Sequence, residues 1–113
     1  MNGTHFQLHT AATDRTLAAD EVAVTGEVDT GNVAEFAQAV RDLPGPRPLL
    51  VDLSAVRYFD SAGFAALDRL LAEHTIVLVI APRAVLSKAA KLLCMPAYDN
   101  ADAARAAVNP QTD

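Results

Sequence analysis

Hydrophobic and polar residues follow two different periods along the chain, and the two periods predict strands that alternate with helices. Alternation with a period of two, typical of half-buried strands, occurs at residues 6–9 and again at residues 21–25. Residues 49–53 and 75–80 form near-continuous apolar runs, which are typical of strands covered on both faces, as in parallel sheets. The small and polar residues 10–20 predict a turn or an irregular hairpin.

Apolar residues at helical spacing predict a helix after the second strand. Its core positions are spaced i, i+3, i+4 and i+7 and share one stripe: Val33, Phe36, Ala37 and Val40. Asn32 is followed three residues later by Glu35, which predicts a capping pair at the start of this helix. Three prolines within residues 44–48 end it, because proline lacks a backbone donor and fixes φ.

Three further helices are predicted in the second half of the chain. The positions expected to face the core are Phe64, Leu67 and Leu71 in the second helix and Val85, Ala89 and Leu92 in the third. The third helix should stop before Pro96. The fourth, at residues 101–108, should be capped by Asp99 or Asn100 and ended by the Asn-Pro pair that follows it.

This alternation predicts an α/β fold with a mixed, mostly parallel sheet of about five strands and about four helices. A chain of 113 residues is the size of one ordinary domain. We therefore expect a single domain over residues 6–108, with loose termini at residues 1–5 and 109–113.

Composition narrows the functional classes. The single cysteine, Cys94, excludes an intrachain disulfide and is expected to be a small buried hydrophobic residue. The amino terminus lacks the pattern of a signal peptide, and no apolar run approaches the length of a membrane span, so we expect a cytoplasmic protein without membrane insertion. The net charge of -5 argues against a nucleic-acid partner, since phosphate binding needs clustered cations.

The chemically informative segment is residues 51–63, where a buried strand is expected to run out into a loop before the second helix. That loop would place Asp60 and Ser61 at the start of the helix, beyond the carboxyl end of a strand, where sites gather in open α/β sheets. A helix N-terminus accepts an anion well, so a phosphate on Ser61 is compatible with the fold. The alternative is that Asp60 or Ser61 only caps the helix, since both residue types are favoured caps.

Catalytic chemistry is not supported by the sequence. A hydrolase elbow needs Gly-x-Ser-x-Gly, and Phe59 stands where the first glycine should be. His74 is expected at the far end of the same helix, roughly 20 Å from Ser61 at 1.5 Å per residue. His5 and His9 lack a third metal ligand at sensible spacing. We therefore expect a binding module rather than an enzyme, with no catalytic residue, metal or cofactor.

Three segments taken together resemble the STAS domains of bacterial anti-sigma factor antagonists (anti-anti-sigma factors). They are Gly-Glu-Val-Asp at residues 26–29, Leu-Val-Asp-Leu-Ser at residues 50–54 and Phe-Asp-Ser-Ala-Gly-Phe-Ala-Ala-Leu at residues 59–67. The resemblance covers residues 6–108, and it implies the STAS fold.

The resemblance also implies a function. Members bind an anti-sigma factor that is itself a GHKL-type serine kinase, and so release a sigma factor. The kinase then phosphorylates the serine that matches Ser61, the complex dissociates, and a phosphatase reverses the step. The implied partner-binding residues are Asp29, Asp60, Ser61, Ala62 and Gly63.

The chain departs from this family pattern in two segments, residues 70–74 and residues 89–98, which are both shorter than in the family. Lys-Leu-Leu-Cys-Met-Pro at residues 91–96 also resembles the ending of STAS subunits of lipid-transport ABC systems. That likeness implies an alternative function, a scaffold that docks on the transport ATPase without any need for phosphorylation.

Overall fold

The fold is taken from a computed structural model that describes residues 5–10, 20–43, 48–73 and 76–108. The elements are β1 (Phe6–Thr10), β2 (Asp20–Val28), α1 (Val33–Arg41), β3 (Leu49–Phe59), α2 (Ser61–Glu73), β4 (Ile76–Val79), α3 (Ser87–Leu92), β5 (Ala97–Tyr98) and α4 (Ala101–Val108). Residues 11–19 of the expected turn and most of both expected loose termini lie outside the described residues, whereas Thr10 ends β1 and Asp20 begins β2. His5 is described, and its carbonyl accepts a hydrogen bond from the backbone N–H of Glu27 at 2.9 Å.

The five strands form one sheet in the order β1-β2-β3-β4-β5. β1 is antiparallel to β2, and the other three pairs are parallel. Each parallel pair is joined by a crossover through one helix, which keeps sequential strands adjacent. The predicted α/β class, with its mixed and mostly parallel sheet and its helices, is confirmed.

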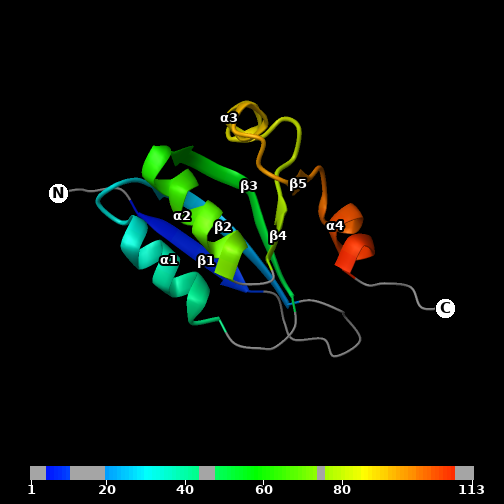
Figure 1. The fold of residues 1–113 in the computed structure, drawn as a ribbon, viewed down its shortest axis with the longest axis horizontal. Coiled ribbons are helices and arrows are strands. Elements are labelled where there is room, and N and C mark those ends of the chain that lie inside the picture. Colours follow the sequence, from blue (N-terminus) through cyan, green and yellow to red (C-terminus); the bar gives the residue numbers. More distant parts are fainter. Residues whose placement is uncertain (1–4, 11–19, 44–47, 74–75, 109–113) are drawn as a thin grey trace.

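The helices cover the two faces of the sheet unequally. Figure 1 shows α1 and α2 side by side against one face, with α4 on the other side of β4. The main core lies under α1 and α2, where Phe36, Leu53 and Leu67 are almost fully buried. A smaller cluster, Leu50, Val79 and Ala104, packs α4 against the opposite face.

The core beneath α1 and α2 contains a chain of aromatic rings that leads to the start of α2. Phe6 contacts Phe36, Phe36 contacts Phe59, and Phe59 contacts Phe64, each edge to face with centroids 5.2–5.6 Å apart. Such edge-to-face pairs are the favoured geometry for buried rings. The last two rings fix the end of β3 against the first turn of α2.

β2 and β3 are both longer than their hydrophobic patterns predicted. β3 continues to Phe59, so the loop expected before Ser61 is reduced to the single residue Asp60. The extension occurs because β2 also continues, past Gly26 to Val28, and the two strands remain paired to their ends. Gly26 permits this course: its φ is +95°, and a Cβ there would lie 2.4 Å from the carbonyl oxygen of His5.

The predicted inward stripe of α3 is wrong at two of its three positions, while the third, Ala89, is half-buried and packs against the core. Val85 and Leu92 are 66% and 78% exposed, and the buried positions are Leu86, Ser87 and Ala90. The reason is that α3 spans only six residues and begins at Ser87, so a different side of the segment faces the core. Cys94, expected to be buried, is also exposed, and its φ of 57° places it in the left-handed region.

The C-terminal helix α4 has the predicted bounds, and of its two possible caps Asn100 is used. The Asn100 side-chain oxygen accepts a hydrogen bond from the backbone N–H of Ala103 at 2.8 Å. Arg105 then ties α4 to β2, because its guanidinium pairs with the carboxylate of Glu21. Within the described ranges, no helix is long and apolar enough to cross a membrane.

Candidate functional site

Two chain segments meet at the carboxyl ends of β2 and β3. Val28 and Phe59, the last residues of these strands, are direct partners in the parallel ladder. The residues that follow them, Asp29 and Asp60, therefore leave the sheet side by side. The backbone N–H of Asp60 also donates to the carbonyl of Val28 at 3.3 Å, which keeps the two exits together.

Asp60 is the cap of α2. Its Oδ1 accepts a hydrogen bond from the backbone N–H of Gly63 at 3.0 Å, which satisfies one of the free donors of the first turn. Its Oδ2 accepts from the backbone N–H of Thr30 at 3.1 Å and from the Thr30 hydroxyl at 3.2 Å. These bonds, that from Gly63 above all, favour the ionised form and hold the pKa of Asp60 below its ordinary value.

Thr30 joins the two segments through its bonds to Asp60, a role that its position in the sequence does not indicate. A threonine directly after the Gly-Glu-Val-Asp segment gives no sign of its partner, because Asp60 lies 30 positions further along the chain. Only the register between β2 and β3 brings the two residues together. The one signal in the sequence is that Thr30 follows the end of a strand, as Asp60 does. If the two strands are neighbours, these two residues can meet.

Asp29 and Asn32 shape the turn that carries Thr30. Oδ1 of Asp29 accepts from the backbone N–H of Gly31 at 2.8 Å, and Oδ1 of Asn32 accepts from the backbone N–H of Asp29 at 2.9 Å. The Asn32 amide also donates to the carbonyl of Glu27 at 2.9 Å. Asn32 is buried and stands at the start of α1, but its side chain does not cap the helix. The expected capping pair of Asn32 with Glu35 is therefore wrong, and Asn32 braces the turn instead.

Ser61, Ala62 and Gly63 form the first turn of α2. Ser61 is exposed, Ala62 is half-buried and Gly63 is buried. Gly63 has a steric reason to be glycine, since a Cβ there would lie 2.8 Å from Cδ2 of Phe59. The strand end and the helix start are thus in direct contact, which presents the Ser61 hydroxyl at the surface on a rigid turn.

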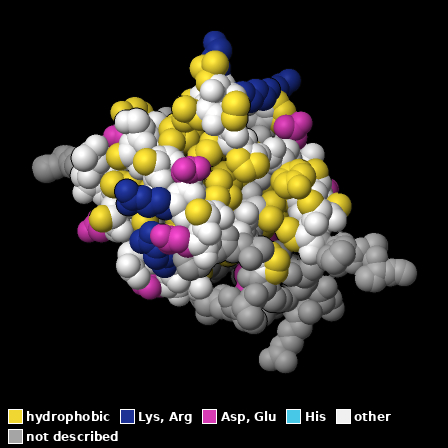
Figure 2. Space-filling view, in the orientation of Figure 1, with side chains coloured by type: hydrophobic (Ala, Val, Ile, Leu, Met, Phe, Trp, Pro, Cys, Tyr) yellow, Lys and Arg dark blue, Asp and Glu magenta, His cyan; other side chains and the backbone are white. Residues whose placement is uncertain are grey.

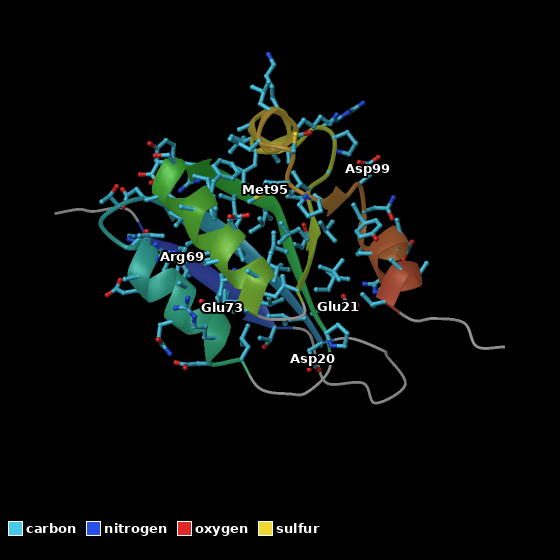
Figure 3. The ribbon with its side chains drawn as sticks, viewed as in Figure 1. Asp20, Glu21, Arg69, Glu73, Met95 and Asp99 are labelled. Carbon is cyan, nitrogen blue, oxygen red and sulfur yellow. The ribbon has the colours of Figure 1, made fainter. Side chains whose placement is uncertain are left out.

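Ser61 also stands at one end of a groove between α2 and the residues that follow α3. The groove has a volume of about 320 Å³ and is lined by Ser61, Phe64, Ala65, Asp68, Leu93 and Met95. The four α2 residues recur at i, i+3, i+4 and i+7, so they form one stripe of that helix. Figure 3 shows Met95 just below α3, on the side that faces α2.

The second wall of the groove is held by the end of α3. The backbone N–H of Met95 donates to the carbonyl of Ala90 at 2.9 Å, and that of Cys94 to the carbonyl of Lys91 at 3.1 Å. This pair of bonds is the Schellman arrangement, in which the residue after the helix adopts the left-handed conformation. Cys94 takes that position in place of the usual glycine, and the arrangement sets the direction in which Leu93 and Met95 leave the helix.

The site presents groups that suit binding at the surface. The lowered pKa of Asp60 makes its carboxylate a weak base toward the neighbouring hydroxyl. Among the residues that the structure describes, no group of three His, Cys, Asp or Glu side chains could hold a metal ion. What the arrangement offers is an exposed hydroxyl at a helix start, beside fixed carboxylates and an apolar groove.

Comparisons with known proteins agree with this architecture. A family model described as "Mlab, STAS domain" matches residues 11–92. Among solved structures, the chain is similar to an anti-sigma factor antagonist from Mycobacterium paratuberculosis. The two share 25% identity over 93% of this chain and 95% of that chain, with a TM-score of 0.68. No curated protein sequence matches the chain.

Proposed function

Because the chain belongs to the STAS domain family, we propose that it acts as an anti-sigma factor antagonist whose binding is controlled at Ser61. In this proposal the chain binds an anti-sigma factor that is also a GHKL-type serine kinase, and a sigma factor is released. The likeness in fold to an anti-sigma factor antagonist supports the choice of partner class. The docking surface comprises Asp29, Asp60, Ser61, Ala62 and Gly63.

The single observation that carries the proposal is the position of Ser61. Ser61 is exposed and is the first residue of a 13-residue helix, directly after the capping Asp60. A kinase can reach such a hydroxyl without unfolding the domain. The helix N-terminus also tolerates the anion that results, because free backbone N–H groups and the positive end of the helix dipole favour negative charge.

Phosphorylation of Ser61 would change the docking surface while leaving the fold intact. It adds about -1.5 to -2 charges and three acceptor oxygens at pH 7. The added group stands beside the ionised Asp60 and at the mouth of the groove that Ser61 lines. A partner fitted to a neutral hydroxyl then meets extra bulk and uncompensated negative charge. A loss of about 2–3 kcal/mol weakens binding by a factor of tens to hundreds.

In this proposal the domain itself performs no catalysis. The base, metal and nucleotide needed for phosphoryl transfer belong to the kinase, and a separate phosphatase restores the hydroxyl. Asp60 serves to fix the first turn of α2, so that Ser61 is held in one orientation for the kinase.

A second candidate function is a scaffold subunit that docks on the ATPase of a lipid-transport ABC system. The observation that favours it is the exposure of the segment at residues 91–96, in which Leu92 and Leu93 are 78% and 55% exposed. A scaffold uses this apolar surface without any change at Ser61. The two candidates therefore differ in whether a covalent change at Ser61 controls binding.

The direct test incubates the protein with anti-sigma factor kinases and ATP and identifies the modified residue by mass spectrometry. We expect one added phosphate, on the peptide that contains Ser61, and none on the Ser61→Ala variant. Ser87, which is buried at the start of α3, serves as an internal control because it should remain unmodified. If no kinase of this class modifies or binds the chain, and a transport ATPase binds it instead, the scaffold function replaces the proposal.

A further inference from the structure

The outer surface of α3 exposes apolar side chains that the fold does not use. Val85, Leu92 and Leu93 are 66%, 78% and 55% exposed. The segment has its own buried residues, Leu86 and Ala90, which anchor it to the core. The exposed set is therefore available to a partner and is not needed to hold α3 in place.

The segment that carries α3 is positively charged in an otherwise acidic protein, while the wall of the groove on α2 includes Asp68. Residues 75–98 contain three of the nine Lys and Arg residues, Arg83, Lys88 and Lys91, and none of the 14 Asp and Glu residues. The chain as a whole carries a net charge of -5. All three cations are exposed, and Figure 2 shows Lys and Arg side chains at the top of the molecule, above a gathering of hydrophobic side chains.

The shape of this surface favours a protein segment over a lipid bilayer. Leu93 is shared between the exposed set and the groove that ends at Ser61. A concave groove of about 320 Å³ matches protruding side chains, whereas a membrane surface is flat. The backbone hydrogen bonds of Cys94 and Met95 fix the groove wall that carries Leu93 and Met95 before a partner binds. Little conformational entropy is therefore lost at this wall on binding.

We propose that α3 and the residues that follow it bind an acidic amphipathic helix of the partner protein. Apolar side chains of that helix fill the groove against Leu93 and Met95, while its carboxylates face Lys88 and Lys91. The proposal rests on the proposed function only in assigning this helix to the anti-sigma factor. Since Ser61 lines the same groove, the helix would lie within reach of the phosphorylation site.

A test that needs no kinase uses two synthetic helical peptides and the isotopically labelled full chain. Both peptides carry leucine at i, i+3, i+4 and i+7, and their flanking positions are all glutamate in one and all lysine in the other. We expect the glutamate peptide to shift the NMR signals of residues 88–95 and of the first half of α2, and to bind about tenfold more tightly than the lysine peptide.

Charge-reversal variants assign the preference to α3. Lys88→Glu and Lys91→Glu should each weaken binding of the glutamate peptide about two- to fivefold, as expected for exposed charge pairs. Arg69→Glu, at an exposed position of α2 outside the groove lining, is the matched control and should have no effect.

Equal binding of the two peptides, or signal shifts confined to other elements, would overturn the proposal. So would binding of the chain to phosphatidylglycerol vesicles that Lys88→Glu abolishes, because the basic surface would then serve a membrane. Failure of these peptide experiments leaves phosphorylation of Ser61 untouched. Conversely, a chain that no kinase modifies can still prefer the glutamate peptide, so the two proposals fail separately.

Discussion

Thr30 and Asp60 join the two turns at the edge of the sheet through one carboxylate oxygen. Both the backbone N–H and the hydroxyl of Thr30 donate to Oδ2 of Asp60, at 3.1 and 3.2 Å. Since Oδ1 of the same side chain caps α2, Asp60 connects the turn after β2 to the helix that begins at Ser61. The position of the serine thus depends on residues from both segments.

Replacing Thr30 by Val tests this connection, because valine keeps the shape of threonine and removes only the hydroxyl. We predict a small fall in the melting temperature, since the hydrogen bond from the Thr30 hydroxyl to Asp60 is lost. Asp60→Ala should lower the melting temperature further, as the cap and both Thr30 bonds disappear together. If Asp60→Ala and Thr30→Val are equally stable to heat, measured by circular dichroism, the carboxylate does not hold the two turns together.

The stability of the domain should decrease in acid. The folded-state pKa of Asp60 is lowered chiefly by the Gly63 hydrogen bond, and that of Glu21 chiefly by the Arg105 hydrogen bond. A group with a lowered folded pKa stabilises the fold above its unfolded pKa, and this contribution is lost as the pH falls through the folded value. Urea unfolding from pH 7 down to pH 3 should therefore show decreasing stability, and Asp60→Asn should reduce the slope. A slope that is unchanged in both Asp60→Asn and Glu21→Gln would contradict these assignments.

Gly63→Ala should destabilise the domain by about 1–3 kcal/mol, the usual cost of forcing an extra methyl group into a packed site. The added Cβ would lie 2.8 Å from Cδ2 of Phe59, so either the ring or the first turn of α2 must move. Ala62→Ser, at the neighbouring half-buried position, is a suitable control. Chemical denaturation measures the stability of both variants. An unchanged denaturation midpoint for Gly63→Ala would show that the first turn of α2 accommodates the methyl group without loss of stability.

Cys94→Gly should stabilise the domain by about 0.5–1 kcal/mol. Cys94 has a φ of 57°, a conformation that costs an ordinary residue roughly 1–2 kcal/mol. Glycine removes this strain, but its greater conformational freedom stabilises the unfolded chain and offsets part of the effect. Cys94→Ala, which keeps the strain, separates this effect from loss of the thiol. A glycine variant no more stable than the alanine variant would argue against the left-handed position.

The sequence predicted those parts of the fold in which local pattern and tertiary packing agree. The apolar run of β4 and the stripe of α1 are clear in the sequence, and the helix that follows Asn100 begins directly after it. The inward stripe of α3 could not be predicted correctly, because six residues make fewer than two turns and Leu86, just outside the helix, takes the core position. The two-residue strand β5 is too short for any period to identify it.

At the site, the residue types identified the candidate residues but not the hydrogen bonds between them. Asp29, Asp60 and Ser61 were expected together, and the structure brings Asp29 and Asp60 out of adjacent strands. The part played by Thr30 depends on strand register, and the groove beside Ser61 depends on how α3 ends. Neither property is visible in the periodicity of the chain. Binding of a partner by these residues stays a prediction.

The most direct test of the account is the affinity of a partner anti-sigma factor for three variants, measured by isothermal titration calorimetry. Ser61→Ala removes the phosphoacceptor hydroxyl, Ser61→Asp adds one negative charge at the same position, and Ala72→Asp adds the same charge at an exposed position near the other end of α2. We predict that Ser61→Ala and Ala72→Asp bind like the unmodified protein, while Ser61→Asp loses at least about tenfold in affinity. Equal affinity of Ser61→Asp and Ser61→Ala would contradict a charge-controlled contact at Ser61.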